Sequence, residues 1–231
     1  MLSGPSATDG GAPCFLFDVD NTLIDNDRFA AGLSARLEAD FGAGERKRYW
    51  DLFERRRTEL GYADYLGALQ MFREGANDHP LLLGMSQYLL EFPFPSLLYP
   101  QALAALAHAA TLGTVGVLSD GDIVFQPHKI RRAGIWDAVH GRVLIYVHKE
   151  RSLGTMQQSL PASHYVIVDD KANLLAAMKE ILGPRLTTMF VRQGHYARAA
   201  AGANAQPPAD MTIDRIGDLL SRQLSDFEVI S

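Results

Sequence analysis

The sequence predicts an α/β fold in which a doubly wound, Rossmann-like parallel sheet carries an inserted bundle of helices. Two observations support this. Short apolar runs typical of buried strands alternate with helical segments along most of the chain. Between the first two runs, however, several amphipathic helices follow one another without a strand. The runs occupy 15–17, 115–118, 143–147 and 165–168, with a fifth strand predicted at 187–191.

Composition excludes several classes of protein. The chain has 231 residues, 47% of them hydrophobic and 21% charged, which is enough for a sizeable globular core. A net charge of -5 argues against a nucleic-acid partner. The single cysteine, Cys14, excludes an intramolecular disulfide and is expected to be a buried apolar residue. Because no apolar run approaches the roughly 20 residues of a membrane helix and no signal peptide is evident, we expect a cytoplasmic protein without a membrane partner.

The composition changes along the chain and divides it into three parts. Residues 1–13 are rich in Gly, Ser and Pro and are expected to be disordered. Residues 14–27 and 93–231 form the predicted α/β core domain. Residues 28–92 form a predicted helical domain, in which apolar side chains recur at helical spacing. Its amphipathic segments lie at 29–41, 49–60, 65–72 and 81–90.

Helices are predicted between the core strands, where mixed segments end at Gly or Gly-Pro. They cover 101–112, 122–133, 151–160 and 173–182, with a last helix near 218–223. Residues 197–209 are rich in Ala, Gly and Pro and are predicted to form a loop.

Two aspartates end the first apolar run. Asp18 and Asp20 stand where ligands bind in open parallel sheets, just beyond the carboxyl end of a strand. Two carboxylates this close are costly unless a cation or a proton separates their charges. The alternative is that they are ordinary turn and helix-capping residues.

Three later strands also end in residues suited to chemistry. The second strand runs into Ser119, the third is followed by Lys149, and the fourth runs into Asp169 and Asp170. If these strands are parallel neighbours, their polar residues meet the first aspartate pair at one edge of the sheet.

In this order and spacing, the four segments resemble the four motifs of the haloacid dehalogenase superfamily of phosphotransferases and hydrolases. The resemblance rests on the D-x-D-x-T stretch, the strand-end serine, and a lysine about twenty residues before an acidic pair, and it spans 15–173. It implies a Rossmann-like core whose helical insertion, residues 28–92, acts as a cap that closes over the active site and selects the substrate.

The resemblance also implies catalytic roles. Asp18 matches the nucleophile that attacks phosphorus and becomes an aspartyl phosphate. Asp20 matches the general acid and base, and it favours phosphate esters because members that cleave carbon–halogen bonds usually lack an acid there. Ser119 and Lys149 match the groups that bind the phosphoryl oxygens. The backbone N–H groups of Asp120 and Gly121 are expected nearby.

A magnesium ion is the implied cofactor, since a carboxylate facing a phosphate dianion needs positive charge. The implied ligands are the Asp18 side chain, the Asp20 carbonyl and an acid of the fourth motif, for which Asp169 is favoured. Asp170 is either a further ligand or a helix N-cap. Asn173 stands where the family often carries a second acid and can still bind the metal or a metal-bound water.

Some residues have competing interpretations. Ser119 could instead cap the next helix, and Lys129 competes with Lys149 although it falls within a helix rather than at a strand end. Asn21 replaces the usual glycine of the family and tolerates a left-handed backbone. Thr22 is expected to stabilise the turn through its hydroxyl.

Basic clusters at 46–48 and 55–57 in the predicted cap are expected to form solvated faces paired with nearby acids, although one arginine could reach into the cleft for an anionic substrate. Arg192, His195 and Tyr196 follow the fifth strand and are either ordinary loop residues or the edge of the site.

Taken together, the residues predict a Mg²⁺-dependent phosphatase that hydrolyses a small phosphomonoester through an aspartyl-phosphate intermediate. A phosphomutase would use the same groups but protect the intermediate from water. A dehalogenase is disfavoured by Asp20. A catalytically idle binding module on the same fold is disfavoured because Asp18, Asp20, Ser119, Lys149 and Asp169 are all present.

Overall fold

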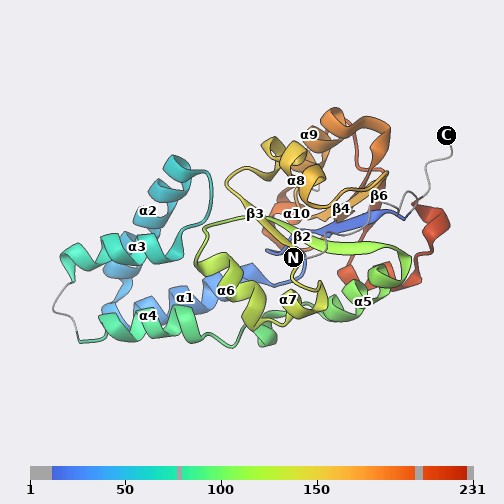
Figure 1. Cartoon of the computed structure of the whole chain (residues 1–231). Helices are drawn as coiled ribbons and strands as arrows, with labels where there is room; N and C mark the ends of the chain where they lie inside the picture. The colour runs from blue at the N-terminus through green and yellow to red at the C-terminus, as the bar shows by residue number, and fades with distance from the viewer. Residues whose placement is uncertain (1–11, 77–79, 201–204, 228–231) are drawn as a thin grey trace, which may run out of the picture.

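In the computed structural model, six parallel strands form one sheet in the order β3-β2-β1-β4-β5-β6 (Figure 1). The structure describes residues 12–76, 80–200 and 205–227, so nearly all of the tail expected to be disordered lies outside the described residues. The strands are β1 (Cys14–Phe17), β2 (Thr114–Asp120), β3 (Val143–Tyr146), β4 (Tyr165–Asp169), β5 (Leu186–Val191) and β6 (Met211–Ile213).

Helices cover both faces of this sheet, as the predicted α/β fold requires. In β1, Phe15 and Phe17 pack into one core cluster, whereas Cys14 and Leu16 pack into another, because successive side chains of a strand point to opposite faces. The first cluster lies under α5 (Ala102–Leu112), α6 (Phe125–Arg132) and α7 (Ile135–Ala138). The second lies under α8 (Leu153–Ser159) and α9 (Ala172–Leu182).

The strand order creates a crevice between β1 and β4. The chain proceeds outward through β1, β2 and β3 and then returns to place β4 on the other side of β1. Connections from β1 and β4 therefore leave in opposite directions, which opens the position where ligands bind in doubly wound sheets. Asp18 follows β1, Asp169 ends β4 and Asp170 comes next.

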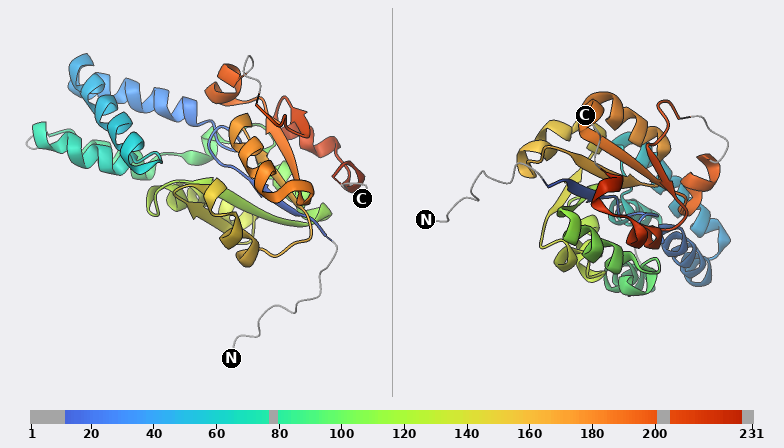
Figure 2. Two further views of the ribbon diagram at one scale, coloured as in Figure 1. Left: turned by 90° about the horizontal axis from the view of Figure 1, so that it is seen from above. Right: turned by 90° about the vertical axis from the view of Figure 1, so that its right-hand side faces the viewer.

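Four helices inserted between β1 and β2 form a unit that we call the cap. They are α1 (Asn26–Phe41), α2 (Ala43–Leu60), α3 (Tyr65–Phe72) and α4 (Leu82–Glu91), and Figure 2 shows them projecting beyond the sheet. Phe29, Leu33 and Leu37 are buried, which confirms the predicted apolar stripe. The first cap helix begins at Asn26, two residues before the predicted boundary, because Asp25 caps it by accepting a hydrogen bond from the Arg28 N–H.

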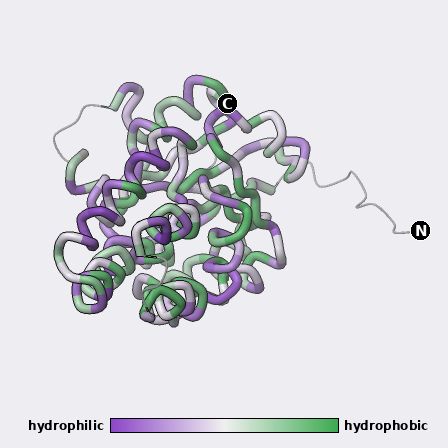
Figure 3. Tube along the Cα trace, turned by 90° about the vertical axis from the view of Figure 1, so that its left-hand side faces the viewer, coloured by the Kyte–Doolittle hydropathy of each residue, from purple (hydrophilic) through white to green (hydrophobic). Residues whose placement is uncertain are grey.

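Polar and apolar stretches alternate along the cap helices, which Figure 3 shows from the cap side. This is typical of helices that bury one face and expose the other. Within the described ranges, none of the helices combines the length and the apolar character that a membrane crossing requires.

Two predictions near the C-terminus were right only in part. The predicted loop 197–209 begins too early, because 197–200 belong to a helix, α10 (Gly194–Ala200), whereas 205–209 are irregular as predicted. The helix predicted near 218–223 is present as a 3₁₀ helix, Ile216–Ser221. A helix as short as α10 is marginal without tertiary contacts. Its contacts with α1, described below, are not visible in the local sequence.

An aromatic cluster around Phe29 joins the cap to the core. The Phe29 ring lies 5.2 Å from Tyr65 of the cap and 5.9 Å from Phe125 of α6, measured between ring centroids. We expect Phe29→Ala to lower the free energy of unfolding by about 3–5 kcal/mol, because it removes a large buried ring and leaves a cavity. Urea denaturation measures this change.

Leu83→Ala is the matched control, because Leu83 is 81% exposed. We expect it to change the free energy of unfolding by less than about 0.5 kcal/mol. Equal losses in the two variants would contradict the assignment of Phe29 to the joint core.

Candidate active site

The turn after β1 places Asp18 at the crevice. Its backbone N–H donates to the Val168 carbonyl at 2.9 Å, which continues the β1–β4 pairing by one residue. The chain then turns at Asn21, whose φ of 62° is the left-handed conformation that the sequence predicted. The Asn21 side-chain oxygen accepts hydrogen bonds from the backbone N–H groups of Asn26 and Asp27, so the turn is fastened to the start of the cap.

The expectation for Thr22 was wrong. Its hydroxyl is buried and forms no hydrogen bond among the described residues, whereas its backbone carbonyl accepts one from the Gln193 side chain at 3.1 Å. Asn21 provides the polar side chain that holds this turn instead.

Lys149 lies against the expected nucleophile. It opens a short 3₁₀ turn after β3 and is completely buried. Its Nζ lies 2.5 Å from Asp18 Oδ1 and 2.6 Å from Asp169 Oδ2. Burial alone would lower the pKa of Lys149, but the two carboxylates raise it above its ordinary value, so the ammonium form is kept.

Three carboxylates form a group that fits a divalent cation. Asp18, Asp169 and Asp170 are buried, and each offers an oxygen within 4.8 Å of the others. Asp18 Oδ2 and both Asp170 oxygens have no hydrogen-bond partner among the described residues. Unpartnered buried carboxylate oxygens are costly, and a hard cation such as Mg²⁺ prefers ligands of this kind. Lys149 and the nearby Lys171 supply two positive charges against three carboxylates.

The electrostatics of the group support the same conclusion. Without a cation, burial raises the pKa of Asp18 to about 7, although Lys149 opposes the shift. Burial and the Asp169 charge raise the pKa of Asp170 to about 9. A bound cation would lower the pKa values of these carboxyl groups, because it favours their ionised forms.

The predicted outer ligands have different surroundings. Asp170 does not cap α9, since the N-cap of that helix is Lys171 and the Asp170 oxygens accept no hydrogen bond from the described residues. Asn173 lies on the first turn of α9 and is exposed, unlike the three buried carboxylates. Its role as a ligand stays a prediction.

Helix α6 holds both Ser119 and Asp20. Ser119 is buried near the end of β2, and its hydroxyl accepts a hydrogen bond from Gln126 Nε2 at 2.9 Å. The same amide group donates to Asp20 Oδ2 at 3.3 Å, while Lys129 Nζ is ion-paired with Asp20 Oδ1. Ser119 does not cap α6, because Asp122 Oδ1 accepts from the first backbone N–H groups there.

Sequence reasoning missed these two partners of Asp20. Gln126 is not among the predicted site residues, and the sequence offers Lys129 only as an alternative to Lys149. The signal available was their spacing of three residues, which places both on one side of a helix that follows the serine strand.

Asp120 and Gly121 link the serine strand to the lysine segment. Asp120 Oδ1 accepts a hydrogen bond from the Lys149 backbone N–H at 2.7 Å, and burial raises the Asp120 pKa. The Gly121 N–H donates to the Tyr146 carbonyl at 3.0 Å. Asp120 thereby positions Lys149, and Gly121 joins β2 to the end of β3. The part of both residues in phosphate binding stays a prediction.

A cleft of about 470 Å³ lies between core and cap over this edge of the sheet. Asp20, Asp120 and Lys171 line it from the core. The cap and α10 contribute a largely aromatic wall of Trp50, Phe53, Tyr62, Tyr65 and Tyr196. Its place beside the motif residues makes it the candidate substrate site.

The predicted basic clusters of the cap are mostly surface pairs. Lys47 pairs with Asp51 at 2.6 Å and Arg48 with Glu45 at 2.7 Å. Arg57 is different, because it lines the cleft and donates a hydrogen bond to the Tyr196 hydroxyl at 2.7 Å.

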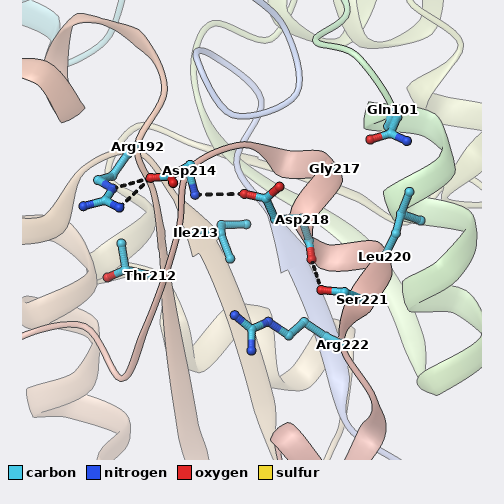
Figure 4. Close-up of a pocket in the computed structure, with 10 residues that line it drawn as sticks. All are labelled: Gln101, Arg192, Thr212, Ile213, Asp214, Gly217, Asp218, Leu220, Ser221 and Arg222. Carbon is cyan, nitrogen blue, oxygen red and sulfur yellow. Dashed lines mark hydrogen bonds and ion pairs between the residues drawn. The ribbon is translucent and has the colours of Figure 1, made fainter.

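The residues after β5 separate into two groups. His195 lies on α10 and lines the edge of the cleft. Its Nδ1 lies 2.5 Å from Asp27 Oδ1 of α1, so the ring is held by a hydrogen-bonded pair between the two helices. Arg192, which the sequence allowed at the site edge, lines another hollow of about 620 Å³ beside β6 and pairs with Asp214 (Figure 4). That hollow contains none of the motif residues.

Comparison with known proteins identifies the family. A crystal structure from Burkholderia xenovorans LB400, described as a haloacid dehalogenase-like hydrolase, shares 54% sequence identity over 92% of this chain and 99% of its own, with a TM-score of 0.85. This chain belongs to the haloacid dehalogenase-like hydrolases. The family assignment confirms the resemblance in the sequence and the type of enzyme, a hydrolase. No protein-family model and no curated protein matches the chain.

More distant hydrolases share the fold. L-2-haloacid dehalogenase from Xanthobacter autotrophicus, with chloropropionic acid covalently bound, has 17% identity over 90% of this chain and 97% of its own, with a TM-score of 0.57. A HAD hydrolase from Bacillus subtilis bound to magnesium has 15% identity over 91% of this chain and 99% of its own, with a TM-score of 0.58. At these identities the likeness shows a common fold alone.

The raised carboxylate pKa values predict how stability depends on pH in EDTA. The folded protein keeps a proton on Asp170 up to about pH 9, whereas the unfolded chain releases it near 3.8. The folded state therefore binds more protons between these values, and the free energy of unfolding falls as pH rises through this range. We expect Asp170→Asn to flatten the decline in urea unfolding measured between pH 6 and 8.5.

Asp51→Asn is the control for this experiment, since the Asp51 side chain is 63% exposed. It is expected to leave the slope unchanged. Added Mg²⁺ should stabilise the original protein more at pH 8.5 than at pH 6, because the ligands must be ionised. A slope that is the same with and without Asp170 would contradict the charge assignment.

Proposed function

We propose that this hydrolase is a Mg²⁺-dependent phosphatase that hydrolyses a small phosphomonoester through a phosphorylated Asp18. The observation that carries the proposal is the position of Asp18. It is buried against the Lys149 ammonium group, and its other oxygen has no hydrogen-bond partner in the part of the chain that the structure describes. A second acid, Asp20, follows two residues further on. A buried carboxylate held in this way is suited to act as a nucleophile.

The first step would transfer the phosphoryl group to the protein. An Asp18 oxygen attacks phosphorus, the bond between phosphorus and the ester oxygen breaks, and Asp20 supplies the proton that the leaving oxygen needs. Lys149 offsets charge on Asp18 and the phosphoryl group, and the Ser119 hydroxyl donates to a phosphoryl oxygen. When bound by Asp18, Asp169, Asp170 and the Asp20 carbonyl, Mg²⁺ supplies the further positive charge that this transfer requires.

The second step would hydrolyse the intermediate. Water attacks phosphorus while its proton passes to the Asp20 carboxylate, and the bond between phosphorus and the Asp18 oxygen breaks. Inorganic phosphate leaves and Asp18 is regenerated. A phosphomutase would exclude this water and transfer the phosphoryl group from Asp18 to another hydroxyl instead. Either enzyme is favoured over an idle binding module, because the chain retains the proposed nucleophile and the groups around it, namely Asp18, Asp20, Ser119, Lys149 and Asp169.

Substitution of the nucleophile tests the proposal. We expect Mg²⁺-dependent release of phosphate from an aryl phosphate at neutral pH, lost in EDTA and reduced by at least about 10³-fold in Asp18→Asn, since the amide is a poor nucleophile. Lys47→Met, an exposed cap variant, is expected to keep full activity. Equal turnover by Asp18→Asn and the original enzyme would overturn the proposal.

A dehalogenase is the second candidate, and the surroundings of Asp20 favour it. Its carboxylate oxygens are engaged by Lys129 and Gln126. Both Asp20 oxygens accept hydrogen bonds, an arrangement that suits a base, and a halide needs no acid when its bond to carbon breaks. Attack of Asp18 on the carbon of a 2-haloacid would give an ester that water then hydrolyses, with Asp20 as the base.

The position of an ¹⁸O label separates the two candidates. In a single turnover in H₂¹⁸O, hydrolysis of an aspartyl phosphate at phosphorus places the label in inorganic phosphate. Hydrolysis of an alkyl ester at its acyl carbon places the label in Asp18, where peptide mass spectrometry finds it. We expect labelled phosphate with an aryl phosphate and no halide release from 2-chloropropionate; labelled Asp18 with halide release would favour the dehalogenase instead.

A further inference from the structure

Lys129 is a buried charge with a single acidic partner. Only 1% of its side chain is exposed, and within the described part of the chain its ion pair is with Asp20, whose side chain is 28% exposed. Burying an ammonium group costs free energy unless it is paired. A lysine at this buried position would therefore be an unfavourable choice if it served only to stabilise the fold. The group that it contacts, Asp20, is the candidate acid and base.

Gln126 forms a second hydrogen bond to the carboxylate of Asp20. It is 4% exposed, and its Nε2 donates to Asp20 Oδ2 while Lys129 binds Oδ1. The two residues lie three positions apart, on one side of α6, so the carboxylate is bound at two points from one rigid helix. A carboxylate oxygen has two lone pairs, so each Asp20 oxygen can still accept a proton.

Helix α6 is itself firmly placed. Asp122 caps its first turn, and Phe125 packs against Phe29 and Phe94 in the aromatic cluster that joins cap and core. Gln126 also donates to the Ser119 hydroxyl, which fixes Asp20 relative to the proposed phosphoryl-binding group. Lys149 contacts Asp18 and Asp169, so the two lysines serve different carboxylates.

We propose that Lys129 and Gln126 are positioning residues that hold the Asp20 carboxylate as the base for hydrolysis of the covalent intermediate. The inference rests on the proposed covalent function. In this step the attacking water gives its proton to Asp20, the new bond forms between water oxygen and phosphorus, and the bond to the Asp18 oxygen breaks. The contact that assigns this role to Lys129 is its ion pair with Asp20, so it acts through Asp20.

The test compares the original enzyme, Lys129→Met, Asp20→Asn and the double variant with an aryl phosphate, whose leaving group needs little protonation. Two quantities are measured: kcat, and the fraction of enzyme that carries the covalent intermediate in the steady state, by intact-protein mass spectrometry after an acid quench. Lys129→Gln is a second variant that keeps a donor without charge. Lys47→Met removes a lysine from an exposed pair with Asp51 and is the matched control.

We expect Lys129→Met to lower kcat by about tenfold or more, less than the 10²–10⁴-fold typical of losing an acid–base group itself. The covalent fraction should rise, because hydrolysis of the intermediate slows more than its formation. In the Asp20→Asn background the same substitution should change kcat by less than about twofold, since coupled residues are not additive.

An equal loss of kcat in both backgrounds, or a lower kcat without accumulation of the intermediate, would overturn the positioning role alone. Absence of the covalent intermediate from the original enzyme and from Asp20→Asn would overturn the proposed function and this inference with it. Should Lys129→Met fail to fold, Lys129→Gln decides by the same criteria.

Discussion

The ion pairs of the buried Lys149 organise this protein. The Lys149 ammonium group binds Asp18 and Asp169, which come from adjacent strands far apart in the sequence. It offsets only part of the negative charge at the crevice, because Asp170 is buried beside them without a hydrogen-bond partner among the described residues. The fold thus assembles an excess of carboxylates that the interior tolerates only through protonation or a bound cation. The same excess of negative charge therefore lowers the stability of the fold when no cation is bound and creates a site suited to a divalent cation.

The cap is joined to the same centre through the turn after β1. Asn21 binds the start of α1 through its side-chain oxygen, and its amide nitrogen donates to Asp27 at 3.0 Å. Asp27 in turn pairs with His195 and Arg198 of α10. Asn21, which directly follows Asp20, therefore contacts the first turn of the first cap helix. Because the left-handed backbone there also suits glycine, the side chain of Asn21 adds a link that glycine would not provide.

The sequence predicted the parts of the site that depend on strand ends. A parallel sheet brings the residues after its strands to one edge, so the positions of Asp18, Ser119, Lys149 and Asp169 follow from the strand pattern. Contacts that depend on helix rotation were not predictable in this way. Lys129 and Gln126 reach Asp20 because one face of α6 is turned toward the residues that follow β1. Likewise, α10 depends on tertiary partners rather than on its own short segment.

The most direct test of the account asks whether Asp18 becomes a covalent intermediate. Enzyme quenched during turnover of an aryl phosphate with Mg²⁺ would be reduced with borohydride, which converts an acyl phosphate to an alcohol, and then digested for peptide mass spectrometry. The account predicts homoserine at position 18 after turnover, an unmodified Asp18 in the substrate-free control, and an unmodified asparagine at this position in the Asp18→Asn variant. Turnover that leaves Asp18 unmodified while another carboxylate is reduced, or while none is, would contradict it.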